Sequence, residues 1–270
     1  MELLRSLSIG QYIPRDSPVH RLDPRTKILA TAAFMVILFL VRGFGGFAVF
    51  AAFLGITFAL AHIPIGFALR SLRPVLFLLL LALLLQLFFG TPEGGTVLVR
   101  MGPLVATREG LLQGLFVTAR LVLLIVGTSL LTYTTSPVAI ADALEHLLNP
   151  FRRIGVPAHE LAMMMTIALR FIPTLVEETE KIIKAQMSRG ADFESGGPLR
   201  RARALLPVLV PLFVGAFRRA EELALAMEAR GYRGGEGRTR MRQLRYTSHD
   251  ALAAVTLVAV GALGLLLGRL

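Results

Sequence analysis

The sequence of 270 residues predicts an all-α integral membrane protein, and three observations carry this prediction. First, 54% of the residues are hydrophobic and the mean hydropathy is +0.66, whereas soluble domains are about 45–50% apolar. Second, the apolar residues gather in five long runs. Third, the Lys and Arg residues are concentrated in a few segments between these runs. Membrane orientation therefore explains the net charge of +11, and nucleic acid is not needed as a partner.

Five apolar runs are predicted to be transmembrane helices: 28–41, 44–61, 74–89, 111–132 and 251–267. A span needs about 20 residues and the run 28–41 is shorter, so this helix must include flanking residues or tilt against its neighbours. His62–Arg73 is predicted to be a short basic loop, and the Gly-rich segment 90–110 a small β-hairpin or re-entrant turn. Gly264 and Gly268 are spaced four residues apart, which is typical of closely packed membrane helices.

The distribution of positive charge predicts the orientation of the chain. Five Lys and Arg residues precede the first run, two lie in the His62–Arg73 loop, and seventeen lie between Ser136 and Asp250. The opposite side receives only four. Because Lys and Arg accumulate on the cytoplasmic side, we expect the N-terminus and the segment after the fourth run to be cytoplasmic, with the C-terminus outside.

The polar segment between the fourth and fifth runs is predicted to be a separate helical unit. Ser136 is suited to cap a short amphipathic helix over Pro137–Asn149. Two long helices follow, at about 158–189 and 199–230, and we expect them to cross. The predicted organisation is an N-terminal cytoplasmic segment with four transmembrane helices (1–135), a cytoplasmic unit of coupling helices (136–247) and a C-terminal transmembrane helix (248–270).

Both long helices end on a small residue, an arginine and a glycine: Ser188-Arg189-Gly190 and Ala229-Arg230-Gly231. Aligning the two arginines also aligns Glu180 with Glu221, so the helices form a degenerate internal repeat. One interpretation is an ordinary helix end, because Gly adopts the left-handed conformation there and Arg complements the helix dipole. The other is a binding end, because a small neighbour lets an exposed guanidinium enter a groove and meet carboxylates.

These residues resemble a known family. The stretch from Arg170-Phe171-Ile172-Pro173 to Ser188-Arg189-Gly190, the ending Ala226–Tyr232 and the opening His20–Lys27 are similar to the transmembrane T component of energy-coupling factor transporters. That group also includes cobalt-transport permeases. The resemblance covers nearly the whole chain.

The resemblance implies a scaffold that joins two cytoplasmic ATP-binding-cassette ATPases to a small membrane protein, the S component, which captures a vitamin or a metal ion. It also implies a location in the cell membrane of a bacterium or archaeon. Each Arg would dock into a groove on one ATPase, so the implied coupling residues are Ser188, Arg189, Gly190, Ala229, Arg230 and Gly231. The family more often has Ala at the position of Ser188, which is also small.

The chain itself is expected to be non-catalytic and to bind no cofactor or metal. It contains no P-loop, so ATP would be used by the partner subunits. His159-Glu160 resembles the start of a zinc-protease motif, but Met163 occupies the position of the second His. The alternative, a self-contained secondary transporter or channel, needs polar groups at mid-membrane, where only Gln86 and Arg120 are available.

Two further sets of charged residues have open interpretations. Arg120 lies within the fourth run, where a charge is costly, so it either forms a buried structural pair or extends its charged end toward the membrane surface. Glu177, Glu178 and Glu180 are predicted to form a solvated helix face, on which they can pair with Lys181 and Lys184.

Overall fold

The computed structural model describes residues 12–89, 96–101, 104–193, 197–234 and 244–269. Most of these residues are helical, which confirms the all-α class. The described residues cluster into two compact units. We call residues 12–143 with 244–269 the bundle unit, and residues 144–234 the arm unit.

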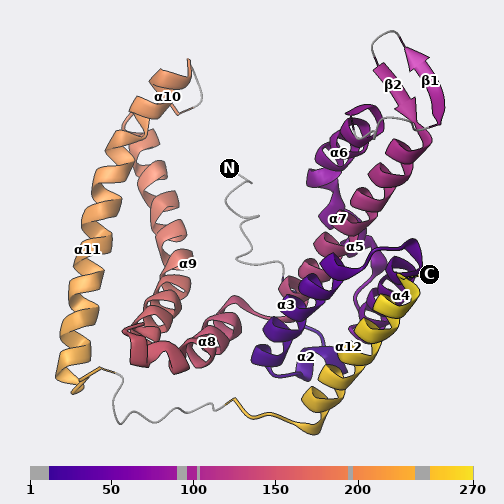
Figure 1. Ribbon diagram of the computed structural model, residues 1–270. Coiled ribbons are helices and arrows are strands. Elements are labelled where there is room, and N and C mark those ends of the chain that lie inside the picture. The colour runs from indigo at the N-terminus through magenta and orange to yellow at the C-terminus, as the bar shows by residue number, and fades with distance from the viewer. Residues whose placement is uncertain (1–11, 90–95, 102–103, 194–196, 235–243, 270) are drawn as a thin grey trace. The chain divides into compact units, whose positions relative to one another are not determined.

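The bundle unit consists of helices and one hairpin (Figure 1). Its helical elements are α2 (Pro18–Arg21), α3 (Pro24–Leu40), α4 (Phe44–Leu60), α5 (Ile65–Leu72), η1 (Arg73–Val75), α6 (Leu76–Phe89), α7 (Arg108–Thr134) and α12 (Ser248–Leu267). Strands β1 (Val97–Met101) and β2 (Leu104–Thr107) pair antiparallel between α6 and α7, which confirms the predicted β-hairpin. The glycine turns predicted at 94–95 and 102–103 lie outside the described residues.

Four described helical segments are long and apolar enough to cross a membrane: Ile65–Phe88, α7, Ala158–Ser188 and α12. The helices α3 and α4, predicted as the first two spans, have 17 residues each. At 1.5 Å per residue, 17 residues extend about 26 Å, which is slightly less than the hydrocarbon core of a bilayer. The segment Ala158–Ser188 meets the same criterion, although the sequence predicted it to be cytoplasmic.

The prediction of a loop over His62–Arg73 is wrong, because most of that segment is the helix α5. Pro64 precedes this helix, and Pro74 lies in the 3-10 turn that leads directly into α6. The hydroxyl of Tyr133 in α7 donates to the carbonyl oxygen of Phe67 in α5 at 3.1 Å. The third apolar segment therefore begins about nine residues earlier than its leucine-rich run.

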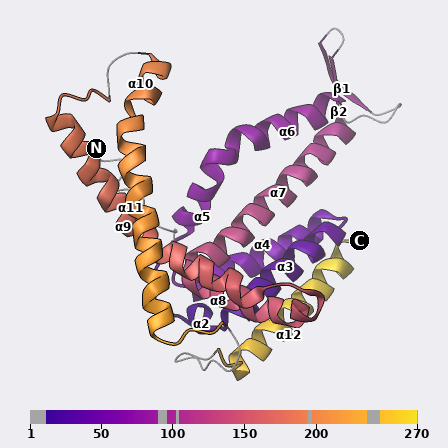
Figure 2. The ribbon, with the colours of Figure 1, turned by 90° about the vertical axis from the view of Figure 1, so that its left-hand side faces the viewer.

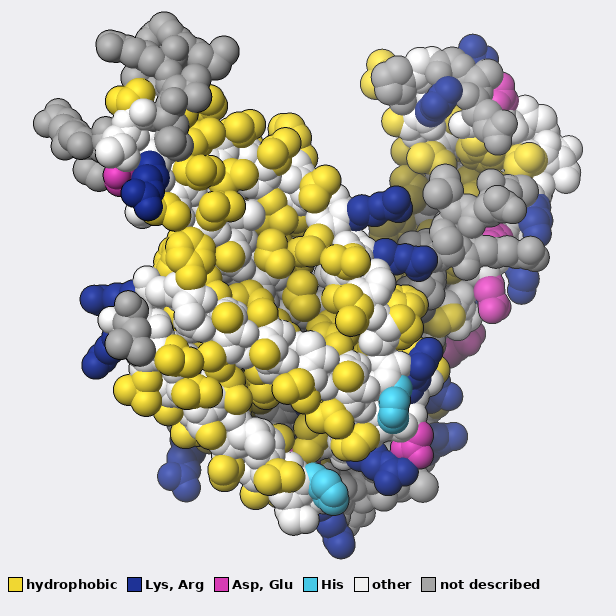
Figure 3. All heavy atoms as spheres, turned by 90° about the vertical axis from the view of Figure 1, so that its right-hand side faces the viewer, with side chains coloured by type: hydrophobic (Ala, Val, Ile, Leu, Met, Phe, Trp, Pro, Cys, Tyr) yellow, Lys and Arg dark blue, Asp and Glu magenta, His cyan; other side chains and the backbone are white. Residues whose placement is uncertain are grey.

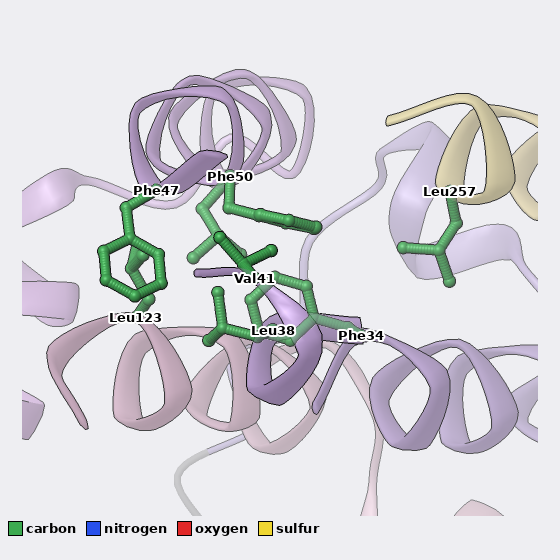
Figure 4. Close-up of a cluster of buried hydrophobic side chains, with 8 residues drawn as sticks. Phe34, Leu38, Val41, Phe47, Phe50, Leu123 and Leu257 are labelled. Carbon is green, nitrogen blue, oxygen red and sulfur yellow. The ribbon is translucent and has the colours of Figure 1, made fainter. Parts of the chain in front are cut away.

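The core of the bundle unit joins α3, α4, α7 and α12 (Figure 4). Its buried residues are Phe34, Leu38, Val41, Phe47, Phe50, Leu54, Leu123 and Leu257. The rings of Phe34 and Phe50 pack edge to face with their centroids 5.5 Å apart, a geometry that aromatic pairs favour. The outer surface is also apolar, and Figure 3 shows a face covered largely by hydrophobic side chains. Such a surface suits contact with lipid.

Glycines bring α4 and α12 into close contact, as the spacing of Gly264 and Gly268 predicted. A Cβ added to Gly46 would lie 2.6 Å from the carbonyl oxygen of Gly264. A Cβ added to Gly43 would lie 2.8 Å from the carbonyl oxygen of Gly268. The two backbones can approach this closely only because side chains are absent from the contact.

Arg120 serves as a cap for another helix. Its Nη2 donates to the carbonyl oxygen of Val41, the C-cap residue of α3, at 2.8 Å. Its guanidinium also lies 4.8 Å from the ring centroid of Phe116. A helix end carries partial negative charge on its free carbonyls, so a cation is stabilised there. Among the described residues, Arg120 has no carboxylate partner; its contacts are a backbone oxygen and aromatic rings.

The opening His20–Lys27 folds into a polar junction at the start of α3. Asp23 caps α3 by accepting from the backbone N–H of Arg25, and its own N–H donates to Asp250 at 2.8 Å. The ammonium of Lys27 donates to the carbonyl oxygens of His20 and Thr134, both at 3.0 Å. Burial lowers the pKa of His20 from its ordinary value. The junction thus ties α3 to the end of α7 and the start of α12.

We expect Lys27→Met to lower the free energy of unfolding of the detergent-solubilised chain by about 2 kcal/mol, because two carbonyls would lose their donor in a buried position. Thermal unfolding monitored by circular dichroism measures the change. Arg21→Met is the control, because Arg21 pairs with Asp16 in the solvent and should leave the transition where it is. Equal transitions for both variants would contradict the structural role of Lys27.

Candidate functional site: two exposed Arg-Gly helix ends

The arm unit is built from five helical elements in sequence: α8 (Pro137–Leu148), which begins in the bundle unit, η2 (Asn149–Ile154), α9 (Ala158–Ser188), α10 (Pro198–Ala204) and α11 (Leu206–Ala229). The hydroxyl of Ser136 accepts from the backbone N–H of Ala139 at 3.3 Å, so the predicted cap of α8 is confirmed. With 31 residues, α9 extends about 46 Å, with Pro173 inside it.

The prediction of a single helix over 199–230 is wrong, because the helix is interrupted at Leu205, between α10 and α11. Proline has no backbone N–H, so Pro207 cannot donate to a carbonyl in the preceding turn. The break therefore falls where the loss of this hydrogen bond weakens the helix. Pro211 nevertheless lies inside α11, so a proline alone does not decide where a helix stops.

The two long helices α9 and α11 cross and run antiparallel (Figure 2). Glu178 on α9 forms an ion pair with Arg219 on α11. Further toward the end of α9, the side-chain amide of Gln186 donates to the carbonyl oxygen of Pro207 near the start of α11, at 3.4 Å. Because later residues of α9 meet earlier residues of α11, the two helices point in opposite directions.

The interpretation of Glu178 as part of a solvated face is wrong, because its carboxylate reaches across to α11. A Cβ added to Gly215 would lie 2.9 Å from Oε1 of Glu178, so the missing side chain leaves room for the carboxylate. Glu178, Gly215 and Arg219 thus form the crossing point. The sequence carried no local signal for this contact, because its partners are about 40 residues apart.

Both long helices end in a Schellman motif. At the end of α9, the N–H of Gly190 donates to the carbonyl oxygen of Met187, and that of Ala191 donates to the carbonyl oxygen of Gln186. Gly190 has a φ of +87°, in the left-handed region. This is the hydrogen-bond pattern of a Schellman helix end, with Arg189 as the C-cap.

The end of α11 repeats this geometry residue for residue. The N–H of Gly231 donates to the carbonyl oxygen of Glu228, and that of Tyr232 donates to the carbonyl oxygen of Met227. Gly231 has a φ of +72°, and Arg230 is the C-cap. The side chains of Arg189 and Arg230 therefore project from equivalent positions, the C-cap of each helix.

The predicted site residues at both ends are exposed: Ser188, Arg189, Gly190, Ala229, Arg230 and Gly231. Within the described part of the chain, neither guanidinium has an ion-pair or hydrogen-bond partner. A Schellman motif needs only the glycine and backbone groups, so it does not require these arginines. Both side chains are available to an external partner.

The two arginines are also placed symmetrically about the crossing point. Arg189 lies 11 residues beyond Glu178, and Arg230 lies 11 residues beyond Arg219. Eleven residues are about three helical turns, or roughly 16 Å. Because the helices are antiparallel, the arginines lie at opposite ends of the crossed pair. The two halves of the internal repeat, α9 and α11, are thus two equivalent arms, each of which ends in an exposed arginine.

We expect Gly190→Ala and Gly231→Ala each to lower the free energy of unfolding by about 1 kcal/mol, because alanine is disfavoured at their positive φ. Thermal unfolding of the full chain measures this. Gly197→Ala is the control, since Gly197 has a φ of −70° and open space where a Cβ would be. A larger loss for the control would show that the left-handed conformation is not the cause.

These features define a class: an all-α integral membrane protein with a membrane bundle and a pair of crossed helices that present exposed arginines. The sequence model of the cobalt transport protein (CbiQ) family matches residues 15–241. The chain belongs to this family, as a transmembrane (T) component of energy-coupling factor transporters.

Relatives from several bacteria align over almost their whole length, and each is named energy-coupling factor transporter transmembrane protein EcfT. The protein of Thermosediminibacter oceani is 59% identical over 96% of this chain and 98% of its own length. That of Acidaminococcus fermentans is 52% identical over 96% and 95%, and that of Bacillus subtilis is 48% identical over 97% and 98%.

Proposed function

We propose that this chain is the coupling subunit of an energy-coupling factor importer. It links ATP hydrolysis by two cytoplasmic ATP-binding-cassette ATPases to the movement of a small membrane S component that captures a vitamin or a metal ion. Arg189 docks on one ATPase and Arg230 on the other, each presented by its small neighbour and its glycine. The chain is not itself an enzyme, and ATP is bound only by the partner subunits.

One observation carries this proposal: equivalent arms end in two exposed arginines that have no partner among the described residues. An arginine that becomes desolvated at an interface can contribute about 2 kcal/mol or more to binding. Its planar fork suits carboxylates in a groove. Two equivalent ends also suit two ATPase subunits of the same fold, because each subunit can meet the same local structure.

The crossing point supports a mechanical role for the arms. When ATP binding brings the two ATPases together, the helix ends move with them, and the ion pair of Glu178 with Arg219 keeps α9 and α11 joined. Exposed apolar side chains along these helices, such as Met164 and Phe213, provide a surface for the S component. Movement of that surface reorients the S component and releases its cargo inside the cell.

The proposed orientation places the N-terminus and the arm unit in the cytoplasm and the C-terminus outside, in the cell membrane of a bacterium or archaeon. The excess of Lys and Arg in the N-terminal segment and between Ser136 and Asp250 supports it. The ATPases are cytoplasmic, so the arms must face that side.

Reconstitution tests the proposal. The tagged chain is co-expressed with two ATP-binding-cassette ATPases and an S component from the same genome, purified, and placed in vesicles that contain ATP. We expect both ATPases to co-purify, and uptake to require ATP and the S component. Uptake by the chain alone would contradict the proposal and favour a self-contained transporter.

A further inference from the structure

A cleft lies between α4 and α12, beyond the glycine contact that joins them. At the contact, Gly46 faces the backbone of Gly264. Closer to the end of α4 and the start of α12, Thr57 and Thr256 line the walls of an apolar cleft with a volume of about 420 Å³. Buried side chains of α3 and α12, among them Phe34, also line it.

The mouth of the cleft is flanked by apolar side chains on the outer surface of the bundle unit. Ile56 on α4 and Leu252 on α12 line the cleft and are 61% and 62% exposed. In a membrane protein, exposed apolar side chains along apolar helices face the acyl chains of the bilayer. The cleft therefore opens sideways toward lipid.

One end of this otherwise apolar cleft is polar. Lys27, Thr134 and His249 line it there. An ammonium has three donors, and Lys27 uses two of them for the carbonyl oxygens of His20 and Thr134. The neighbouring carboxylate of Asp250 already accepts from the backbone N–H groups of Asp23 and Thr247. This end therefore presents hydrogen-bond donors beside a carboxylate, a polar environment that suits the headgroup and ester groups of a lipid.

We infer that the cleft is a lipid site, which holds one acyl chain of a phospholipid while the phosphate and ester oxygens lie near Lys27 and His249. An acyl chain is narrow and apolar like the cleft, and the headgroup of the same lipid matches the polar end.

Brominated phosphatidylglycerol tests this inference, because bromine on an acyl chain quenches tryptophan and the chain contains none. Ile56→Trp places the probe at the mouth of the cleft, and Val255→Trp places a matched probe on α12 outside the lining, where Val255 is 65% exposed. The full chain in detergent is titrated with the lipid. We expect Ile56→Trp to be quenched near one lipid per protein, and Val255→Trp only at a tenfold or greater excess.

Filling the cleft provides the second measurement. In the Ile56→Trp chain, Ala253→Phe with Thr256→Phe should remove the preferential quenching, because both residues line the cleft. Equal quenching of the two probes in the otherwise unchanged chain would overturn the site even if the filled variant failed to fold. Preferential quenching that survived the filling would also overturn it. Loss of quenching at Ile56→Trp on assembly, with a cross-link to a partner protein, would assign the cleft to that protein instead.

Discussion

The double substitution Arg189→Glu with Arg230→Glu is expected to abolish both co-purification of the ATPases and ATP-dependent uptake. Each arginine is exposed and lacks a partner within the described chain, so its reversal should cost the folded chain little. At an acidic groove, by contrast, a carboxylate meets like charge. Loss of about 2 kcal/mol at each end corresponds to a roughly 30-fold weaker contact.

Single and conservative substitutions sharpen this prediction. Arg189→Glu or Arg230→Glu alone should weaken the assembly without abolishing it, because the other helix end can still dock on its ATPase. Arg→Lys keeps the charge but loses the planar fork, so we expect an intermediate loss of ATPase binding. Pull-down of the ATPases by the tagged membrane chain, followed by uptake in vesicles, measures both effects.

Arg218→Glu is the matched control for charge reversal on the same helix. Arg218 is exposed on α11, and its Nε lies 3.6 Å from Oε1 of Glu222, which makes a weak ion pair. It lies 12 residues before Arg230, so its reversal should leave assembly and uptake unchanged. If the control lost the ATPases to the same extent as the double variant, general electrostatics would explain the result and the role of the helix ends would be refuted.

Gly46→Leu is expected to destabilise the bundle unit by about 3 kcal/mol and to reduce the amount of chain in the membrane. The first added carbon would meet both the side chain of Val41 and the backbone oxygen of Gly264. Backbone cannot move aside as a flexible side chain can, so α4 and α12 must separate. Fluorescence-detected gel filtration after heating gives the loss of stability.

Gly55→Leu on the same helix is the control, because a Cβ added there has no atom within 4 Å. The glycine is exposed, so leucine should be accommodated and should leave the melting temperature near that of the unchanged chain. A melting temperature for Gly46→Leu equal to that of the control would show that the close approach of α4 and α12 is not needed.

The helices and the two Arg-Gly ends could be predicted because their signals are local. Apolar runs indicate membrane helices by their length and composition, and the Ser136 cap and the two glycine helix ends act through hydrogen bonds within a few residues. The β-hairpin after α6 was predicted from the Gly-rich composition of its segment, which is also a local feature of the sequence. The sequence also carries a local signal for α5: Pro64 directly precedes Ile65, Ala68, Leu69 and Leu72, which have the spacing of one helix face.

Contacts between distant segments could not be predicted from one sequence. Arg120 donates to a helix C-cap that lies 79 residues earlier, and its position in an apolar run did not indicate this partner. The pair of Glu178 with Arg219 depends on the antiparallel crossing of α9 and α11, and the charge pattern of α9 alone favoured a solvated face. The break before Pro207 was equally undetermined, because Pro173 and Pro211 lie inside helices.

Cross-linking from the helix ends tests the central claim most directly. The chain has no cysteine, so Ser188→Cys and Ala229→Cys each place one photo-activated cross-linker beside an arginine while leaving both arginines intact. In the assembled transporter, we predict that each position cross-links to an ATPase subunit, and that Thr256→Cys in the bundle unit does not. Helix ends that cross-link to no ATPase, or only to the S component, would contradict the account.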